Sequence, residues 1–235
     1  DLRDAVEAAK KQRVAVVVVG LPDSYESEAF DRDHMRLPEG HNKLVEAVAE
    51  ANPNTVVVLL GGSAMELPWA DQVKAILYMG LPGQAGGEAA ANLLTGKANP
   101  CGKLTETWPC SYEDVICKDT FGKKNTEYRE GIYVGYRYYD KAKKSVRYPF
   151  GHGLSYTTFA YSDLIVRDRK VSVQVKNTGA VSGAEVVQLY IAAPKGGIFR
   201  PVRELRGFER VELEPGESKI VEFTLDDRSF AIWSD

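Results

Sequence analysis

Short apolar runs rich in β-branched residues recur along the first hundred positions of the chain. Apolar residues at helical spacing occur before the first run, between the first and second, and after the third. We predict strands at 13–19, 55–60, 73–79 and 103–108, and helices at 1–12, around 44–49, and at 88–95. This alternation predicts a mostly parallel sheet whose strands are buried on both faces. The first part is therefore predicted to be a partial α/β/α sandwich.

Beyond residue 159 the apolar pattern changes to a period of two. Apolar and polar residues alternate over 171–175 and again over 221–225. The turn-forming sequences Asn-Thr-Gly at 177–179 and Glu-Pro-Gly-Glu at 214–217 lie next to these stretches. The pattern predicts an all-β, immunoglobulin-like sandwich, with about five of the usual seven strands present.

The stretch between these two patterns has no repeating apolar period. It is polar at first and then holds a dense group of aromatic residues from Tyr133 to Phe159. Such rings can stack on sugars or form a packed seam between two domains, and we favour the seam. We therefore predict an α/β domain over 1–108, a connecting segment over 109–158 and a β-sandwich over 159–235.

A long polar loop from Gly20 to His41 follows the first predicted strand directly. It carries a cluster of charged side chains: Asp23, Glu26, Glu28, Asp31, Arg32 and Asp33. Open α/β sheets place ligand sites at the carboxyl ends of their strands. A solvated acidic loop with local ion pairs is the alternative, but irregular loops of this length in compact domains are usually functional or disordered. We favour a functional loop.

The charges of this loop suit proton transfer. A carboxylic acid acts as a general acid near neutral pH only where its surroundings hold the proton on, and acidic neighbours have that effect. Arg32 acts in the opposite sense, because a guanidinium favours ionised carboxylates, and it can hold a second carboxylate such as Asp31 in a forked pair. Glu26 and Glu28 are the candidate acids.

Composition and charge exclude several classes of partner. The chain has 235 residues, 44% of them hydrophobic and 27% charged, as in soluble globular proteins. Its net charge of -3 argues against nucleic acid and against an anionic membrane surface, since both select for a basic face. No apolar run is long enough to span a bilayer. We therefore expect neither nucleic acid nor a membrane as a partner.

The cysteines and histidines of the chain lack the spacing of metal ligands, so we predict no metal and no cofactor. Free thiols, together with a charged helix rather than a signal peptide at the start, favour a cytoplasmic over a secreted protein. Gly61-Gly62-Ser63 lacks the Lys-Ser or Lys-Thr of a phosphate loop. We interpret it as a tight turn.

Several specific motifs are distributed along the chain. They are Ser27-Glu-Ala-Phe-Asp-Arg32, Met35-Arg-Leu-Pro38, Ala51-Asn-Pro-Asn-Thr-Val-Val-Val58, Pro68-Trp69, Cys101-Gly-Lys-Leu-Thr105 and Tyr148-Pro-Phe-Gly-His-Gly-Leu-Ser-Tyr-Thr157. Together they resemble the C-terminal half of glycoside hydrolase family 3, of the β-glucosidase type. The sandwich resembles the fibronectin type III-like domain appended to many members. Ala29 and Phe30 stand where this family more often has glycine and tyrosine.

The resemblance implies a retaining β-glucosidase that hydrolyses terminal non-reducing β-D-glucosyl residues of a β-glucoside or oligosaccharide. Retention needs two carboxylates about 5 to 5.5 Å apart. The family motif places the acid/base on Glu28, with Glu26 as the alternative. Glu26, Asp31 and Arg32 are implied to bind substrate or orient the loop. The family's N-terminal barrel, which carries the nucleophilic aspartate, is the implied missing partner.

Both ends of the chain are expected to be cut, because it starts on a helix without a preceding strand and stops before the sandwich is complete. The fragment alone is expected to be inactive. Two other functions stay open: a non-catalytic carbohydrate-binding or interaction module, and a β-xylosidase or arabinofuranosidase of the same family. An upstream barrel would exclude the module. The sequence also leaves a homo-oligomer open.

Overall fold

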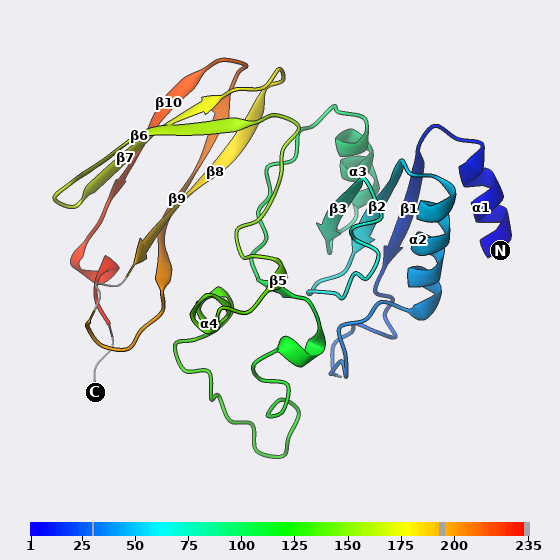
Figure 1. The fold of residues 1–235 in the computed structure, drawn as a ribbon, viewed down its shortest axis with the longest axis horizontal. Helices are drawn as coiled ribbons and strands as arrows, with labels where there is room; N and C mark the ends of the chain where they lie inside the picture. The colour runs from blue at the N-terminus through cyan, green and yellow to red at the C-terminus, as the bar shows by residue number, and fades with distance from the viewer. Residues whose placement is uncertain (30, 193–195, 233–235) are drawn as a thin grey trace. The chain divides into compact units, whose positions relative to one another are not determined.

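The computed structural model describes residues 1–29, 31–192 and 196–232 (Figure 1). The chain divides into two compact units. The first, the α/β unit, holds residues 1–94 and 108–129. The second, the sandwich unit, holds residues 95–107 and 130–235. Each unit has its own sheets and its own buried side chains.

A three-stranded parallel sheet in the order β1-β2-β3 forms the centre of the α/β unit. Its strands are β1 (Ala15–Gly20), β2 (Thr55–Leu60) and β3 (Ala75–Gly80). Val57 pairs with Val17 on one side and with Ile76 on the other. The parallel pairing confirms the predicted α/β class. The bounds of β2 match the prediction, whereas β3 begins at Ala75 rather than at residue 73.

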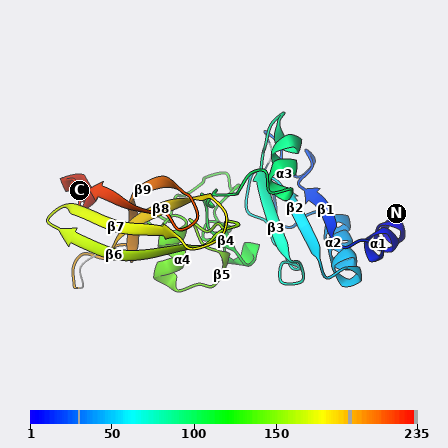
Figure 2. The same cartoon turned by 90° about the horizontal axis from the view of Figure 1, so that it is seen from above.

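Three helices accompany this sheet. They are α1 (Leu2–Lys10), α2 (Glu39–Ala51) and α3 (Gly86–Leu94), each close to a predicted helix. α1 packs against α2, and α2 packs against β1 and β2. The side chains of Val45, Val48 and Ala49 form the buried stripe of α2. In both ribbon views α2 lies beside β1 and α3 beside β3 (Figures 1 and 2).

The prediction that the first strand is buried on both faces is wrong. Val17 and Val19 of β1 are buried, but Val16 and Val18 are 49% and 60% exposed. Within the described part of the chain, no element covers the face on which Val16 and Val18 lie. An apolar run indicates at least one buried face, but its periodicity does not show whether anything covers the second face.

The predicted fourth strand at 103–108 is also wrong, because strand structure is confined to β4 (Trp108–Pro109). Residues 103–107 adopt no regular structure. The amide of Leu104 donates to the carbonyl of His152 (2.8 Å), and the amide of Gly151 donates to the carbonyl of Leu104 (2.7 Å). The backbone N–H and C=O groups of Leu104 are both bonded to this turn, so they do not pair with a neighbouring strand.

The second unit contains the predicted β-sandwich, whose first strand begins at Phe159. Its strands are β6 (Phe159–Arg167), β7 (Lys170–Asn177), β8 (Gly183–Ala192), β9 (Arg203–Leu213) and β10 (Ser218–Thr224). One antiparallel sheet has the order β10-β7-β6, and β8 pairs with β9 in the other. Val175, Val187, Leu213 and Val221 form the buried core. Burying a side chain of this size contributes about 1.5–3 kcal/mol.

Asn177 fixes the predicted turn at 177–179. Its Oδ1 accepts hydrogen bonds from Thr157 Oγ1 (2.6 Å) and from the amide of Gly179 (3.0 Å). Its Nδ2 donates to the carbonyls of Val181 (2.8 Å) and Leu213 (3.0 Å). The Asn177 side chain is fully buried and cannot bond to solvent water, so these four hydrogen bonds satisfy its polar atoms instead.

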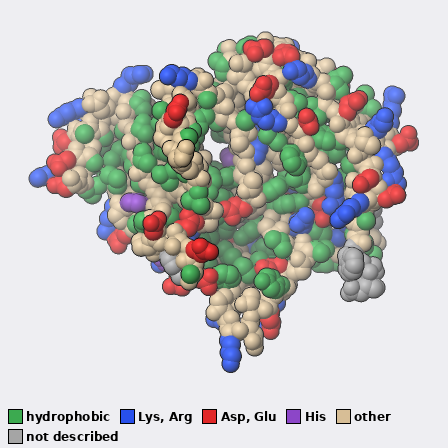
Figure 3. All heavy atoms as spheres, turned by 180° about the vertical axis from the view of Figure 1, so that it is seen from behind, with side chains coloured by type: hydrophobic (Ala, Val, Ile, Leu, Met, Phe, Trp, Pro, Cys, Tyr) green, Lys and Arg blue, Asp and Glu red, His purple; other side chains and the backbone are tan. Residues whose placement is uncertain are grey.

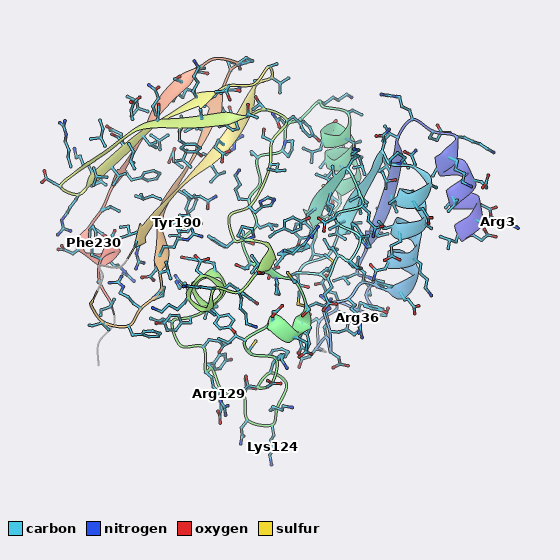
Figure 4. All side chains as sticks on the ribbon, viewed as in Figure 1. Arg3, Arg36, Lys124, Arg129, Tyr190 and Phe230 are labelled. Carbon is cyan, nitrogen blue, oxygen red and sulfur yellow. The ribbon has the colours of Figure 1, made fainter. Side chains whose placement is uncertain are left out.

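The segment between β4 and β6 contains structure that the sequence pattern did not predict. This segment holds the 3₁₀ turn η1 (Tyr112–Asp114), α4 (Tyr136–Ala142) and β5 (Val146–Tyr148). A second 3₁₀ turn, η2 (Asp227–Ser229), lies outside it, after β10. Tyr136 stacks on Phe150 (4.8 Å) and meets the ring of Tyr190 edge-on (5.9 Å). These rings therefore pack within the sandwich unit. Lys124 and Arg129 lie far out on the irregular stretch that follows η1 (Figure 4).

Acidic and basic side chains are intermixed on the face of the molecule that Figure 3 shows, with apolar side chains between them. No single sign of charge dominates that face. Among the described residues, no helix combines the length and the apolar character that crossing a membrane requires.

Candidate active site

Two connections leave the sheet of the α/β unit at the same edge. The acidic loop (residues 21–38) begins after Gly20, at the carboxyl end of β1. The turn Gly61-Gly62-Ser63, called the β2 turn below, begins after Leu60, at the carboxyl end of β2. Because β1 and β2 pair in parallel along their whole length, these two connections start side by side. The amide of Leu21 donates to the carbonyl of Leu60 (3.0 Å).

Glu26 joins the acidic loop to the β2 turn. The amide of Gly62 donates to Glu26 Oε2 (2.7 Å), and Ser63 Oγ donates to Glu26 Oε1 (3.0 Å). Arg32 Nη1 in turn donates to Ser63 Oγ (2.6 Å). Both oxygens of Glu26 are therefore occupied by hydrogen bonds. Glu26, Ser63 and Arg32 form one network that holds the loop before and after Glu28.

The Arg32 guanidinium is partly buried beside this network. Burial lowers the pKa of Arg32, and the negative charge of Glu26 offsets part of that effect. Its Nε and Nη2 atoms are buried and have no hydrogen-bond partner among the residues that the structure describes. The expected forked pair with Asp31 is absent from the described ion pairs, and Arg32 donates to Ser63 instead.

Asp31 is exposed and faces a different segment. A Cβ atom placed on Gly122 would lie 3.7 Å from Asp31 Oδ2. The irregular segment after η1 therefore approaches the acidic loop. Asp31 therefore lies near enough to this segment to influence how the loop lies against it.

Glu28 is exposed, and its carboxyl group makes no hydrogen bond within the described residues. It lies between Glu26 and Arg32 in the sequence, so both of its flanks are anchored while its own side chain is free. The next residue, Ala29, has a φ of 73°, in the left-handed region that favours glycine. Phe30, the next position of the motif, lies outside the described residues.

Replacing Ala29 by glycine is expected to stabilise the chain by about 0.5–1 kcal/mol, because the left-handed cost of a Cβ exceeds the entropy gained by the unfolded chain. Urea unfolding measures the change. Ala47→Gly, inside α2, is the matched control and is expected to destabilise by about 1 kcal/mol. An equal loss from both substitutions would contradict the left-handed conformation of Ala29.

The end of the acidic loop is anchored separately. Met35 and Leu37 are buried, and the amide of Glu66 donates to the carbonyl of Met35 (2.9 Å). Glu66 Oε1 also accepts a hydrogen bond from the amide of Tyr112 (2.8 Å). Arg36 lies at this end of the loop, shortly before α2 (Figure 4). The loop is thus fixed at its start, its middle and its end.

Of the residues selected from the sequence, the structure brings Glu26 and Arg32 together and leaves Glu28 and Asp31 exposed. Sequence reasoning missed Gly62 and Ser63. The feature that could have indicated them is their position directly after the carboxyl end of the neighbouring parallel strand. The described residues contain no group of three or more His, Cys, Asp or Glu side chains that could hold a metal ion.

Two family models match the chain. The model described as glycosyl hydrolase family 3 C-terminal domain matches residues 1–156, and the model described as fibronectin type III-like domain matches residues 185–235. The first of these ranges includes the whole acidic loop and the β2 turn.

The chain is similar to several characterised proteins. It is 51% identical over 244 residues to thermostable β-glucosidase B of Acetivibrio thermocellus, covering 99% of this chain and 32% of that protein. The β-glucosidase of Kluyveromyces marxianus, solved in complex with glucose, superposes with a TM-score of 0.91 at 44% identity, covering 97% of this chain and 28% of that one. The Bifidobacterium adolescentis GH3 β-glucosidase gives a TM-score of 0.95 at 43% identity, covering 100% and 36%. The chain thus spans less than a third of the curated relatives it matches.

Proposed function

The chain belongs to glycosyl hydrolase family 3, as its C-terminal domain, and we propose that the complete protein is a retaining β-glucosidase with Glu28 as its acid/base. The similar proteins whose names describe an activity are β-glucosidases. The proposed substrates are β-glucosides or oligosaccharides with a terminal non-reducing β-D-glucosyl residue.

One observation carries the choice of Glu28. Both oxygens of Glu26 accept hydrogen bonds from the β2 turn, which hold its carboxyl group against the protein. The carboxyl group of Glu28, two residues later, is exposed and makes no hydrogen bond with the described residues. A general acid must come within hydrogen-bond reach of the atom it protonates. Glu28, whose carboxyl group is exposed and makes no hydrogen bond with the described residues, meets this requirement better than Glu26.

In the proposed first step, Glu28 protonates the glycosidic oxygen while a carboxylate on the opposite side of the sugar attacks the anomeric carbon. The bond from that carbon to the glycosidic oxygen breaks, and the aglycone leaves as a neutral alcohol. In the second step Glu28, now ionised, takes a proton from water. The water oxygen attacks the anomeric carbon, the glycosyl ester breaks, and the nucleophile is released.

The other three selected residues support this role. We propose that Glu26 orients the loop through its two hydrogen bonds and that Arg32 orients it through Ser63. Nε and Nη2 of Arg32 are buried without a partner among the described residues, so a substrate hydroxyl or a carboxylate that reached them would satisfy two donors. Asp31 is proposed to set the position of the loop against the segment around Gly122.

We propose that the nucleophile belongs to an N-terminal barrel of the complete protein. The two carboxylates of a retaining enzyme must lie about 5 to 5.5 Å apart on either side of the scissile bond. Glu26 is tied to the β2 turn, and Asp31 is directed toward the segment around Gly122. Neither is therefore placed as a nucleophile opposite Glu28.

The purified chain of residues 1–235 is expected to hydrolyse no aryl β-glucoside. Protonation of the leaving group without a nucleophile leaves the oxocarbenium-like transition state largely unstabilised. Release of nitrophenol from a nitrophenyl β-glucoside measures this. The Glu28→Gln chain is the control for contaminating activity. Turnover that Glu28→Gln abolishes would place the nucleophile inside this chain and overturn the proposal.

A further inference from the structure

We propose that the β2 turn is a positioning element for the acid/base loop, and that Ser63 is a positioning residue of the reaction. This inference rests on the proposed role of Glu28. The sequence alone favoured a plain tight turn at these positions. The structure gives the turn specific partners on both sides of Glu28.

The hydroxyl of Ser63 has a defined direction. A guanidinium carries only donors, so Ser63 Oγ accepts from Arg32 Nη1. The single proton of the hydroxyl is then directed to Glu26 Oε1. One hydroxyl therefore connects a cation and an anion that lie on opposite sides of Glu28 in the sequence. Hydrogen bonds to charged groups are roughly twice as strong as neutral ones.

The β2 turn is itself fixed to β3. The amide of Gly61 donates to the carbonyl of Gly80 (3.1 Å), and the hydroxyl of Tyr78 donates to the carbonyl of Gly61 (2.8 Å). The ring of Tyr78 meets the ring of Trp108 edge-on at 5.0 Å, and Trp108 is buried. The β2 turn is thus held through Tyr78, whose ring packs on the buried Trp108, and this turn holds the acidic loop.

Gly62 allows the close approach that the network needs. A Cβ atom at this position would lie 3.0 Å from Leu81 Cδ1 and 3.2 Å from Glu26 Oε1. Both distances are shorter than ordinary van der Waals contacts. A larger residue would therefore push Glu26 away from the amide that binds it.

Loss of the Ser63 hydroxyl frees both flanks of Glu28 together. Arg32 would lose its one hydrogen bond among the described residues, and Glu26 would keep only the bond from Gly62. A displacement of about 1 Å at a catalytic group can cost about 100-fold in rate. The loss falls on proton transfer, so it should depend on how much the leaving group needs a proton.

The test uses the complete enzyme and two substrates, methyl β-glucoside and 2,4-dinitrophenyl β-glucoside. Ser63→Ala is expected to lower kcat/KM about 100-fold for the methyl glucoside, which needs protonation, and less than about 5-fold for the activated one. Ser63→Thr keeps the hydroxyl and should restore both values to within about 3-fold of wild type. Ser24→Ala, at an exposed serine of the same loop, should change neither. Melting curves of each variant exclude differences in folding.

An equal loss on both substrates, or no loss, would overturn the positioning role of Ser63. Glu28→Ala, measured with the same two substrates, separates this failure from failure of the proposed function. If Glu28→Ala shows leaving-group dependence and Ser63→Ala does not, only the positioning role is wrong. If Glu28→Ala shows none, Glu28 is not the acid, and the proposal that the turn positions it is wrong as well.

Discussion

Replacing Glu28 by alanine in the complete enzyme is expected to lower kcat/KM for methyl β-glucoside by about 10³-fold. A methoxide leaving group departs only when it is protonated, and alanine cannot supply that proton. For 2,4-dinitrophenyl β-glucoside the loss in kcat/KM should be below about 10-fold, because a stable phenolate leaves without general acid catalysis. The proposed free carboxyl group of Glu28 accounts for this difference.

Steady-state kinetics with a series of aryl glucosides measures this effect as a change in slope against the pKa of the leaving phenol. In the Glu28→Ala variant kcat/KM should depend steeply on the pKa of the leaving phenol, whereas in the wild type it should depend on it only weakly. Asp23→Asn is the matched control, since Asp23 is an exposed carboxylate of the same loop to which no role is assigned. An unchanged slope in Glu28→Ala, with activity lost equally on all substrates, would contradict the assignment.

Replacing Gly20 by alanine is expected to have the largest effect on stability, a loss of about 3 kcal/mol. A Cβ atom at Gly20 would lie 2.7 Å from Leu60 Cβ and closer still to the carbonyl oxygen of Leu60. The opposing atoms belong to β2, whose residues Val57 and Leu59 are fully buried, so they cannot move aside. The sheet would have to open at the edge where the acidic loop begins.

Gly40→Ala is the matched control for this substitution. Gly40 lies in the first turn of α2, and a Cβ there meets nothing within 4 Å. Alanine at this position should therefore stabilise by about 0.5 kcal/mol, because it restricts the unfolded chain. Urea unfolding of both variants gives the two free energies. A Gly20→Ala chain as stable as wild type would show that the β1–β2 contact is not as close as described.

The elements predicted best were those whose boundaries are set locally. β2 was predicted to the residue, because Asn54 and Gly61 bound a run of one threonine and five apolar residues. The sandwich followed from its period of two. In contrast, Lys103 to Trp108 was predicted to be a strand, but Leu104 pairs with a turn near Gly151, far away in the sequence. Local pattern cannot reveal a partner that distant.

In the candidate site, too, features set by local sequence were predicted and features set by distant partners were not. Glu28 could be proposed from the sequence because its motif lies within six consecutive residues. Ser63 was missed because its partners, Glu26 and Arg32, lie more than 30 residues away in the sequence. Parallel pairing of β1 and β2 brings Ser63 close to Glu26 and Arg32. The sequence of a strand does not by itself identify the strand with which it pairs. The exposed face of β1 was missed for a similar reason, since the pattern does not say what covers it.

Azide rescue tests the assignment of Glu28 most directly. In Glu28→Ala an activated aryl glucoside should still form the glycosyl enzyme, whose hydrolysis then lacks a general base. Azide needs no base: it attacks the anomeric carbon, the glycosyl ester breaks, and β-glucosyl azide is released. We expect azide to restore turnover and to yield β-glucosyl azide in Glu28→Ala but not in Glu26→Ala. Formation of β-glucosyl azide by Glu26→Ala, while Glu28→Ala only raises KM, would contradict it and make Glu26 the acid/base.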